Sequence, residues 1–339
     1  ALQTRFGTEH LSLTNSCTSA LTMALKLAGV GPGDEVISTP MTCVATNTPI
    51  VNLGADIVWA DVNPEHGMLD PVSVKELLNS HPKVKAIIAV AWAGTPPDLQ
   101  ALQIVKGSGC KLILDAAHAF DAGYKDVQIH EWADYTCYSF QAIKHFTTGD
   151  GGALVCDSLS DHQRAKALKW FGLDRDRAKD ANGNWKGQQW DVDILEAGYK
   201  FNMNNVAAAI GLSQLPDIDH NLYVHRRNAD LYDELFQEDE IVRRVRRPYG
   251  AKSSAWVYTV LLHPWNSKLS RDALLKALND EGIMAGVVHV PNDDYTCFDK
   301  FRAPSLPGVR QFSAVQFSLP CGWWLSVDDV KHIASRVKE

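Results

Sequence analysis

The stretch VKAIIAVAWAGTPPDLQALQIVKGSGCKLIL, residues 84–114, decides the fold. It contains two apolar segments, 84–91 and 111–114, and a helical pattern between them at 99–106. Two apolar strands joined by a helix are typical of a parallel βαβ unit. The uninterrupted run AIIAV at 86–90 fits a strand that is buried on both faces. The stretch therefore predicts an α/β protein with helices on both sides of a mostly parallel sheet.

The same alternation extends over the first two-thirds of the chain. We predict strands at 11–13, 35–38, 57–60, 135–140 and 153–156, and helices at 18–27, 43–53, 71–79 and 204–215. The polar, glycine-punctuated segment 174–189 is expected to be a long surface loop or lid. A charged helix at 221–236 leads into strands at 256–262 and 285–290 and helices at 271–281 and 327–338. We expect a large domain over residues 1–220 and a smaller α+β domain over residues 221–339.

The composition excludes several classes of protein. The 339 residues are 45% hydrophobic and 22% charged, with a net charge of −7, which is ordinary for a globular protein. Nucleic acid is not an expected partner, because phosphate backbones require a basic face. Neither is a membrane, since no apolar run approaches the roughly 18 residues that a spanning helix needs.

The seven cysteines are scattered, odd in number and contain no C-x-x-C pair. This pattern disfavours a disulfide framework and a zinc knuckle, and it favours a reducing compartment. We therefore expect a cytoplasmic protein with no metal site. The chain does not begin with Met, and we expect its start to be processed or trimmed.

Hydroxyl residues follow the first predicted strand, in the segment NSCTSAL at 15–21. No G-x-G-x-x-G motif and no Walker A motif is present. Ser16, Cys17 and Thr18 stand where a strand leads into a helix. They either form an ordinary helix cap or leave free N–H groups at the positive helix end, which suits a phosphate.

Two further residues, Asp115 and Lys144, are candidates for ligand binding or catalysis. Asp115 ends an apolar strand, where open α/β sheets place ligand residues. It either binds a metal, a ribose hydroxyl or a protonated ring nitrogen, or it caps the next turn. Lys144 follows a strand and precedes the glycine-rich segment TTGDGG at 147–152. It is either a solvated surface charge or a partly buried, nucleophilic amine.

Together these segments supply what pyridoxal 5′-phosphate (PLP) needs: a phosphate cup, a carboxylate that keeps the pyridine nitrogen protonated, and a Schiff-base lysine. With those residues identified, the sequence resembles the DegT/DnrJ/EryC1/StrS family of sugar aminotransferases, which are fold-type-I PLP enzymes. The resemblance covers nearly the whole chain and rests on GPGDEVI at 31–37, DAAH at 115–118, SFQAIK at 139–144, GDGG at 149–152 and GYKFNMN at 198–204. It implies an α/β fold-type-I PLP transferase, with a mostly parallel seven-stranded sheet in a PLP-binding large domain, a smaller C-terminal α+β domain and a homodimer.

The resemblance assigns roles to individual residues. Lys144 would bind the cofactor as its Schiff-base lysine and shuttle the proton, and Asp115 would pair with the pyridinium nitrogen. The other cofactor residues it implies are Ser16, Cys17, Thr18 and Ser139 at the phosphate, Ala117 against a ring face, His118 near the ring hydroxyl, and Lys200 and Asn202 reaching the partner subunit's site.

Three residues depart from the family pattern. Cys17 replaces the usual Gly or Ala, so its contribution is a backbone N–H. Cys43 stands where an aromatic residue often stacks on the cofactor ring, so the resemblance predicts weaker binding of the cofactor here. Lys200 replaces the commoner Asn and adds charge near the phosphate.

Two segments of the last third are open to more than one interpretation. His289, Asn292 and Asp293, in GVVHVPNDD at 286–294, either reach the sugar or its nucleotide or form a polar loop of the small domain. The pair Trp323–Trp324 is expected to pack in the core rather than to stack on a ligand.

The resemblance implies an aminotransferase that moves an amino group from an amino acid, expected to be glutamate, to a nucleotide-linked keto sugar of polysaccharide biosynthesis. A PLP-dependent sugar dehydratase of the same family is disfavoured, since those enzymes carry His where Lys144 stands. A non-catalytic PLP-binding or regulatory member and an enzyme that acts on amino acids alone are the remaining alternatives.

Overall fold

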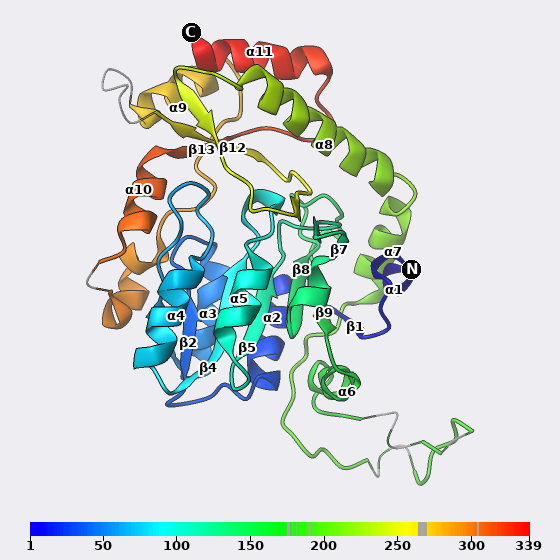
Figure 1. Cartoon of the computed structure of the whole chain (residues 1–339). Helices are drawn as coiled ribbons and strands as arrows, with labels where there is room; N and C mark the ends of the chain where they lie inside the picture. Colours follow the sequence, from blue (N-terminus) through cyan, green and yellow to red (C-terminus); the bar gives the residue numbers. More distant parts are fainter. Residues whose placement is uncertain are drawn as a thin grey trace.

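The computed structural model describes residues 1–174, 177, 179–180, 182–188, 190, 192–263, 270–303 and 305–339 (Figure 1). The α-helices are α1 Leu2–Phe6, α2 Cys17–Leu27, α3 Val44–Asn52, α4 Pro71–Ser80, α5 Leu99–Lys106, α6 Leu159–Leu168, α7 Asn205–Gln214, α8 Ile218–Leu235, α9 Arg271–Asp280, α10 Pro307–Val315 and α11 Val327–Lys338. Short 3₁₀ helices lie at η1 Trp92–Gly94, η2 Ile129–Trp132, η3 Asn292–Asp294 and η4 Thr296–Phe301. In the part of the chain so described, no helix is long and apolar enough to cross a membrane.

The strands form one large and two small sheets. They are β1 Leu11–Thr14, β2 Glu35–Ser38, β3 Asp56–Trp59, β4 Val84–Val90, β5 Lys111–Asp115, β6 Gly123–Tyr124, β7 Val127–Gln128, β8 Tyr135–Ser139, β9 Gly152–Cys156, β10 Val242–Arg244, β11 Ala251–Lys252, β12 Tyr258–Leu262 and β13 Gln316–Leu319. The large sheet has seven strands in the order β1-β9-β8-β5-β4-β2-β3. Strands β8, β5, β4, β2 and β3 pair in parallel, and β9 pairs antiparallel with both β8 and β1. The expected mostly parallel seven-stranded sheet is confirmed.

Both faces of this sheet are buried, as the apolar run in β4 predicts. Ala86 and Ile88 belong to one core cluster, together with side chains of α2. Ile87 and Ala89 belong to the cluster on the opposite face, together with side chains of α4 and α5. Since successive side chains of a strand point to opposite faces, a strand covered on both sides must be apolar at every position.

The C-terminal part has its own core. The antiparallel sheet β10-β12-β13 packs with the inner faces of α8, α9 and α11 around Tyr232, Val260, Phe317 and Ile333. Helix α8 runs from the large sheet into this part, because Ile218 and Leu222 belong to a large-sheet cluster whereas Tyr232 belongs to the C-terminal one (Figure 1).

The structure differs from the predicted elements at several places. The strand expected at 285–290 is wrong, because that segment makes only an isolated bridge from Gly286 to Ser318. Strand β13 takes the place beside β12 instead. The core position expected for Trp323 and Trp324 is also wrong, since they are 52% and 63% exposed. The loop predicted at 174–189 lies partly outside the described residues.

Candidate active site

The start of helix α2 presents N–H groups at the end of strand β1. Ser16 is the N-cap residue, and its side chain accepts the N–H of Ser19 at 3.1 Å. The predicted cap is therefore present. By helix geometry the N–H groups of Cys17 and Thr18 have no carbonyl of their own helix to bond. These groups and the positive helix end favour an anion at this position.

Gly152 lets two strands approach this turn closely. It opens β9 and pairs with Ser139, the last residue of β8. A Cβ atom on Gly152 would lie 2.6 Å from the carbonyl carbon of Ser16 and 2.7 Å from the nitrogen of Cys17. Only a glycine therefore fits here, and it brings Ser139 and the α2 turn, which are far apart in sequence, to one place.

Asp115 lies at the carboxyl end of β5, and both of its oxygens have partners. Oδ2 accepts the hydroxyl of Thr46 at 2.7 Å, and Oδ1 accepts the N–H of Ala117 at 3.0 Å. Oδ1 also lies 3.9 Å from Sγ of Cys17. The side chain thus caps the next turn and faces the α2 turn at the same time. Burial raises the pKa of this carboxyl, and the hydrogen bonds from Thr46 and Ala117 oppose that effect.

Lys144 is partly buried in the turn after β8. Burial lowers the pKa of its ammonium group to about 8, while the nearby Asp115, Cys17 and Cys43 raise it in part. A lysine with this pKa is a mixture of amine and ammonium near neutral pH, so it can act as a nucleophile and can carry a proton. The structure therefore brings together Lys144, Asp115 and the start of α2, as the sequence predicts.

Trp256 is a residue of this site that the sequence interpretation missed. The Nζ atom of Lys144 lies over its ring, 3.8 Å from the centroid. The ring of His118 stacks on it, with centroids 3.9 Å apart and planes 21° apart. The indole N–H donates to the carbonyl of Ile143 at 2.8 Å. No local signal marks Trp256, because it is the first residue of an ordinary apolar strand pattern, far along the chain from Lys144.

A cavity of about 570 Å³ adjoins Lys144 and Trp256. Met284, Trp323 and Trp324 also line it, which accounts for the exposure of these large apolar side chains. Trp256, Trp323 and Trp324 thus give the wall of this cavity an aromatic surface.

Two histidines of the predicted site have unpartnered nitrogen atoms. In the described residues, Nδ1 of His118 and Nε2 of His289 are buried without a hydrogen-bond partner. Their rings stack with centroids 5.4 Å apart. Burial lowers the pKa of His118 well below its usual value and that of His289 to about 4, and the nearby Lys144 acts in the same direction. Both rings are therefore neutral at pH 7 and offer a polar atom to a ligand.

Lys200 and Asn202 lie beside the end of β1. Asn202 forms a bridge with Thr14, and the N–H of Asn15 donates to the carbonyl of Phe201 at 2.8 Å. The Nζ atom of Lys200 lies 3.4 Å from the ring centroid of Trp170 and 3.1 Å from Oδ1 of Asn202. This segment is therefore held next to the residue that precedes the α2 turn.

The other two predicted substrate residues are engaged within the protein. The side chain of Asn292 donates to the carbonyl of Thr42 at 2.8 Å and accepts from Asn47 at 2.9 Å. Asp293 is buried and pairs with Arg310. These contacts fix the loop after His289 against the start of α3 and against α10.

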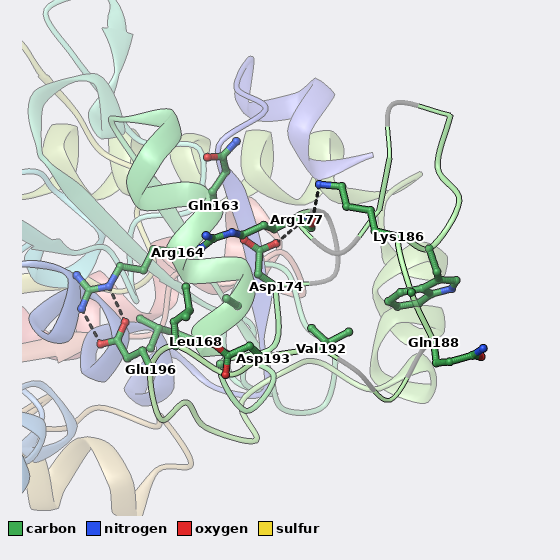
Figure 2. Close-up of a pocket in the computed structure, with 15 residues that line it drawn as sticks. Gln163, Arg164, Leu168, Asp174, Arg177, Lys186, Gln188, Val192, Asp193 and Glu196 are labelled. Carbon is green, nitrogen blue, oxygen red and sulfur yellow. Dashed lines mark hydrogen bonds and ion pairs between the residues drawn. The ribbon is translucent and has the colours of Figure 1, made fainter.

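A separate cavity of about 490 Å³ lies between α6 and the segment that follows it (Figure 2). Arg164 forms a bidentate ion pair with Glu196 on its wall, with N–O distances of 2.7 and 2.8 Å. None of the site residues predicted from the sequence lines this cavity.

The family model of the DegT/DnrJ/EryC1/StrS aminotransferase family matches residues 1–338, so the chain belongs to this family. The spore coat polysaccharide biosynthesis protein SpsC of Bacillus subtilis is 30% identical, over 98% of this chain and 86% of SpsC. The solved structure of the sugar aminotransferase CalS13 from Micromonospora echinospora has a TM-score of 0.89 and 32% identity, covering 99% of this chain and 89% of CalS13. A further solved structure is the PLP form of Spr1654 from Streptococcus pneumoniae, whose description is "putative sugar aminotransferase". It has a TM-score of 0.88 and 25% identity, covering 99% of this chain and 88% of Spr1654.

The residues present fit PLP. The free N–H groups of the α2 turn can hold a phosphate, and Gly152 lets this turn lie close to Ser139, whose hydroxyl is a further donor. Asp115 offers an acceptor for a protonated ring nitrogen, and Lys144 offers an amine. The orphaned nitrogen of His118 is a further polar group that lacks a partner within the protein.

Proposed function

We propose that this protein is a PLP-dependent aminotransferase that moves an amino group from an amino acid, with glutamate as the expected donor, to a nucleotide-linked keto sugar. The observation that carries the proposal is the joint placement of Lys144, Asp115 and the α2 turn at the carboxyl ends of the strands. Relatives support the sugar substrate: a Campylobacter jejuni relative that is 29% identical is named UDP-4-amino-4,6-dideoxy-N-acetyl-beta-L-altrosamine transaminase.

Each group has a defined task in this proposal. The N–H groups of Cys17 and Thr18, with the hydroxyl of Ser139, hold the cofactor phosphate. Asp115 pairs with the ring nitrogen, Ala117 contacts a ring face, and the neutral His118 bonds the ring hydroxyl. When bound, PLP supplies an electron sink that makes a proton on the substrate carbon removable.

Lys144 moves that proton in the proposal. Its Nζ atom takes the proton as a neutral amine and returns it as an ammonium group. A pKa of about 8 suits both directions, because neither form is strongly favoured near neutral pH. The cavity bounded by Met284, Trp323 and Trp324 gives the substrate access to Nζ.

The test has two parts. Lys144→Ala should remove the visible absorbance of the lysine-bound cofactor and reduce turnover by about 10³-fold or more. A screen of nucleotide-linked keto sugars against the pyridoxamine-loaded protein should show one of them restoring the PLP spectrum. Unchanged absorbance and turnover in the variant would end the proposed mechanism. Cofactor binding without conversion of any sugar would favour the non-catalytic alternative.

We propose that the protein works as a homodimer in which Lys200 and Asn202 reach the partner's site. The support is the exposed apolar face of α7, where Val206 is 73% and Leu212 is 61% exposed, close in sequence to Asn202. Mixing Lys144→Ala subunits with Asn202→Ala subunits tests this. Hybrid dimers should regain activity if Asn202 acts across the interface, and no activity should return if it acts within its own subunit.

The division of the chain also belongs to this proposal. We place the boundary between the cofactor-binding domain and the small domain within α8, close to the predicted 220/221 boundary. The change of core cluster along this helix supports it. We also propose a cytoplasmic location, supported by seven cysteines that are all free.

A further inference from the structure

We propose that Trp256 is a positioning residue that holds Nζ of Lys144 against its ring whenever the amine is not bonded to the cofactor. The proposal rests on the function assigned above to Lys144. The indole ring is proposed as the place where the Lys144 side chain rests, so Trp256 acts on the reaction through Lys144 and not on the substrate.

The indole ring is fixed from several sides. Its N–H donates to the carbonyl of Ile143 at 2.8 Å, so the ring is tied to the residue that precedes Lys144. His118 covers one face at a centroid distance of 3.9 Å. The Nζ atom of Lys144 lies 3.8 Å from the centroid of the same ring.

The backbone that carries Trp256 is also anchored to the large sheet. The N–H of Trp256 donates to the carbonyl of Ala93 at 3.0 Å, and the N–H of Ser254 donates to that of Gly94 at 3.0 Å. The hydroxyl of Ser254 donates to the carbonyl of His118 at 2.9 Å. Residues 254–256 are thus bonded to the segments that follow β4 and β5, and the ring has little freedom to move with the C-terminal part.

The groups around Lys144 and the indole ring together set the balance between its neutral amine and its ammonium form. The titratable groups around Nζ are Asp115, Cys17, Cys43, His118, His145 and His289. Burial favours the neutral amine, whereas an aromatic face attracts the ammonium form. The low pKa of His118 keeps this ring neutral, so it does not repel the ammonium charge.

A fixed position for the Lys144 side chain is useful because its amine is bonded to the cofactor at one stage of the proposed reaction and free at another. The four-carbon arm of a free lysine samples many rotamers, and holding it in one position removes that freedom before the proton transfer. The ring keeps Nζ beside the cavity and does not bind it covalently, so the arm can be displaced and recaptured.

The experiment compares Trp256→Phe with Trp256→Leu in the cofactor-free protein. Both substitutions remove the indole N–H and leave an apolar side chain of similar size, and only Phe retains an aromatic face. The pKa of Lys144 is measured from the pH dependence of its acetylation by brief pulses of acetic anhydride, read by mass spectrometry of the Lys144 peptide. Lys169, another lysine whose pKa burial lowers, is followed in the same digest as the control.

We expect the pKa of Lys144 in the Leu variant to lie about half a unit or more below that in the Phe variant, a roughly threefold change in the ratio of ammonium to amine. The pKa of Lys169 should be the same in both. A Lys144 pKa in the Leu variant equal to or above that in the Phe variant would overturn the proposal. If either variant fails to fold, Trp256→Tyr replaces Phe and Trp256→Met replaces Leu. This readout does not require turnover, so the proposed aminotransferase activity can fail while the positioning role stands.

Discussion

The hydroxyl of Thr46 donates to Oδ2 of Asp115 at 2.7 Å, which joins the first turn of α3 to the carboxyl end of β5. The hydroxyl of Thr42 lies 2.7 Å from that of Thr46 and completes a chain of hydrogen bonds. Because Ala117 occupies the other oxygen of Asp115, the carboxylate has a fixed orientation toward the α2 turn. Thr46 therefore supports the site without being part of any motif in the sequence.

Thr46→Val should raise the pKa of Asp115 further and lower the free energy of unfolding of the cofactor-free protein by about 1–3 kcal/mol. Valine keeps the shape and removes the donor. A folded-state pKa above the unfolded value means that stability falls as the pH rises through it, so the loss should grow with pH. Urea unfolding at several pH values measures this. Thr48→Val on the same helix, whose hydroxyl donates to the carbonyl of Val44, is the control and should show no such growth.

Asp115→Asn should reduce kcat by about 10²–10³-fold, because a neutral amide does not stabilise a positive ring nitrogen. The fold should persist, since Asn keeps an acceptor oxygen at this position. Asp134→Asn is the matched control. Asp134 pairs with Lys106 and Lys111 at the beginning of β5, so this change should lower stability and leave the kcat of the folded enzyme near that of the wild type. Equal losses of kcat in the two variants would contradict the role of Asp115.

Gly152→Ala should weaken the binding of PLP to the cofactor-free protein by tenfold or more, about 1.4 kcal/mol. The added methyl group meets backbone atoms of Ser16 and Cys17, so the α2 turn must move away from Ser139. Titration of the apoprotein with PLP measures the affinity. Gly109→Ala, where a Cβ atom meets nothing within 4 Å, should leave it unchanged.

The lowered pKa of Lys144 predicts a pH-dependent stability of the cofactor-free protein. Between pH 8 and the ordinary lysine pKa of about 10.4, the unfolded chain retains a proton that the folded protein has released. Stability should therefore rise with pH in this window, by at most about 3 kcal/mol from this group. The comparison with Lys144→Met cancels the other titrating groups. A difference between the two proteins that stays constant from pH 7 to pH 10 would refute the assigned pKa.

Local patterns were sufficient for the elements of the large sheet. The helix predicted at 99–106 and the strand predicted at 35–38 match α5 and β2 at both ends. The strand predicted at 285–290 fails because its apolar residues form one bridge rather than a ladder, and β13 occupies the position beside β12. Trp323 and Trp324 were expected in the core since large aromatic residues are most often buried, yet they line the cavity beside Lys144.

The sequence by itself determined the chemical groups of the site and their places at strand ends, because a strand buried on both faces must be apolar and only its end can carry Asp115 or lead to Lys144. The tertiary structure decided which side chains surround those groups. Trp256 reaches Lys144, and Thr46 reaches Asp115, through contacts between segments far apart in the chain. Such contacts leave no periodic pattern, since they depend on how the C-terminal part and α3 pack against the sheet edge.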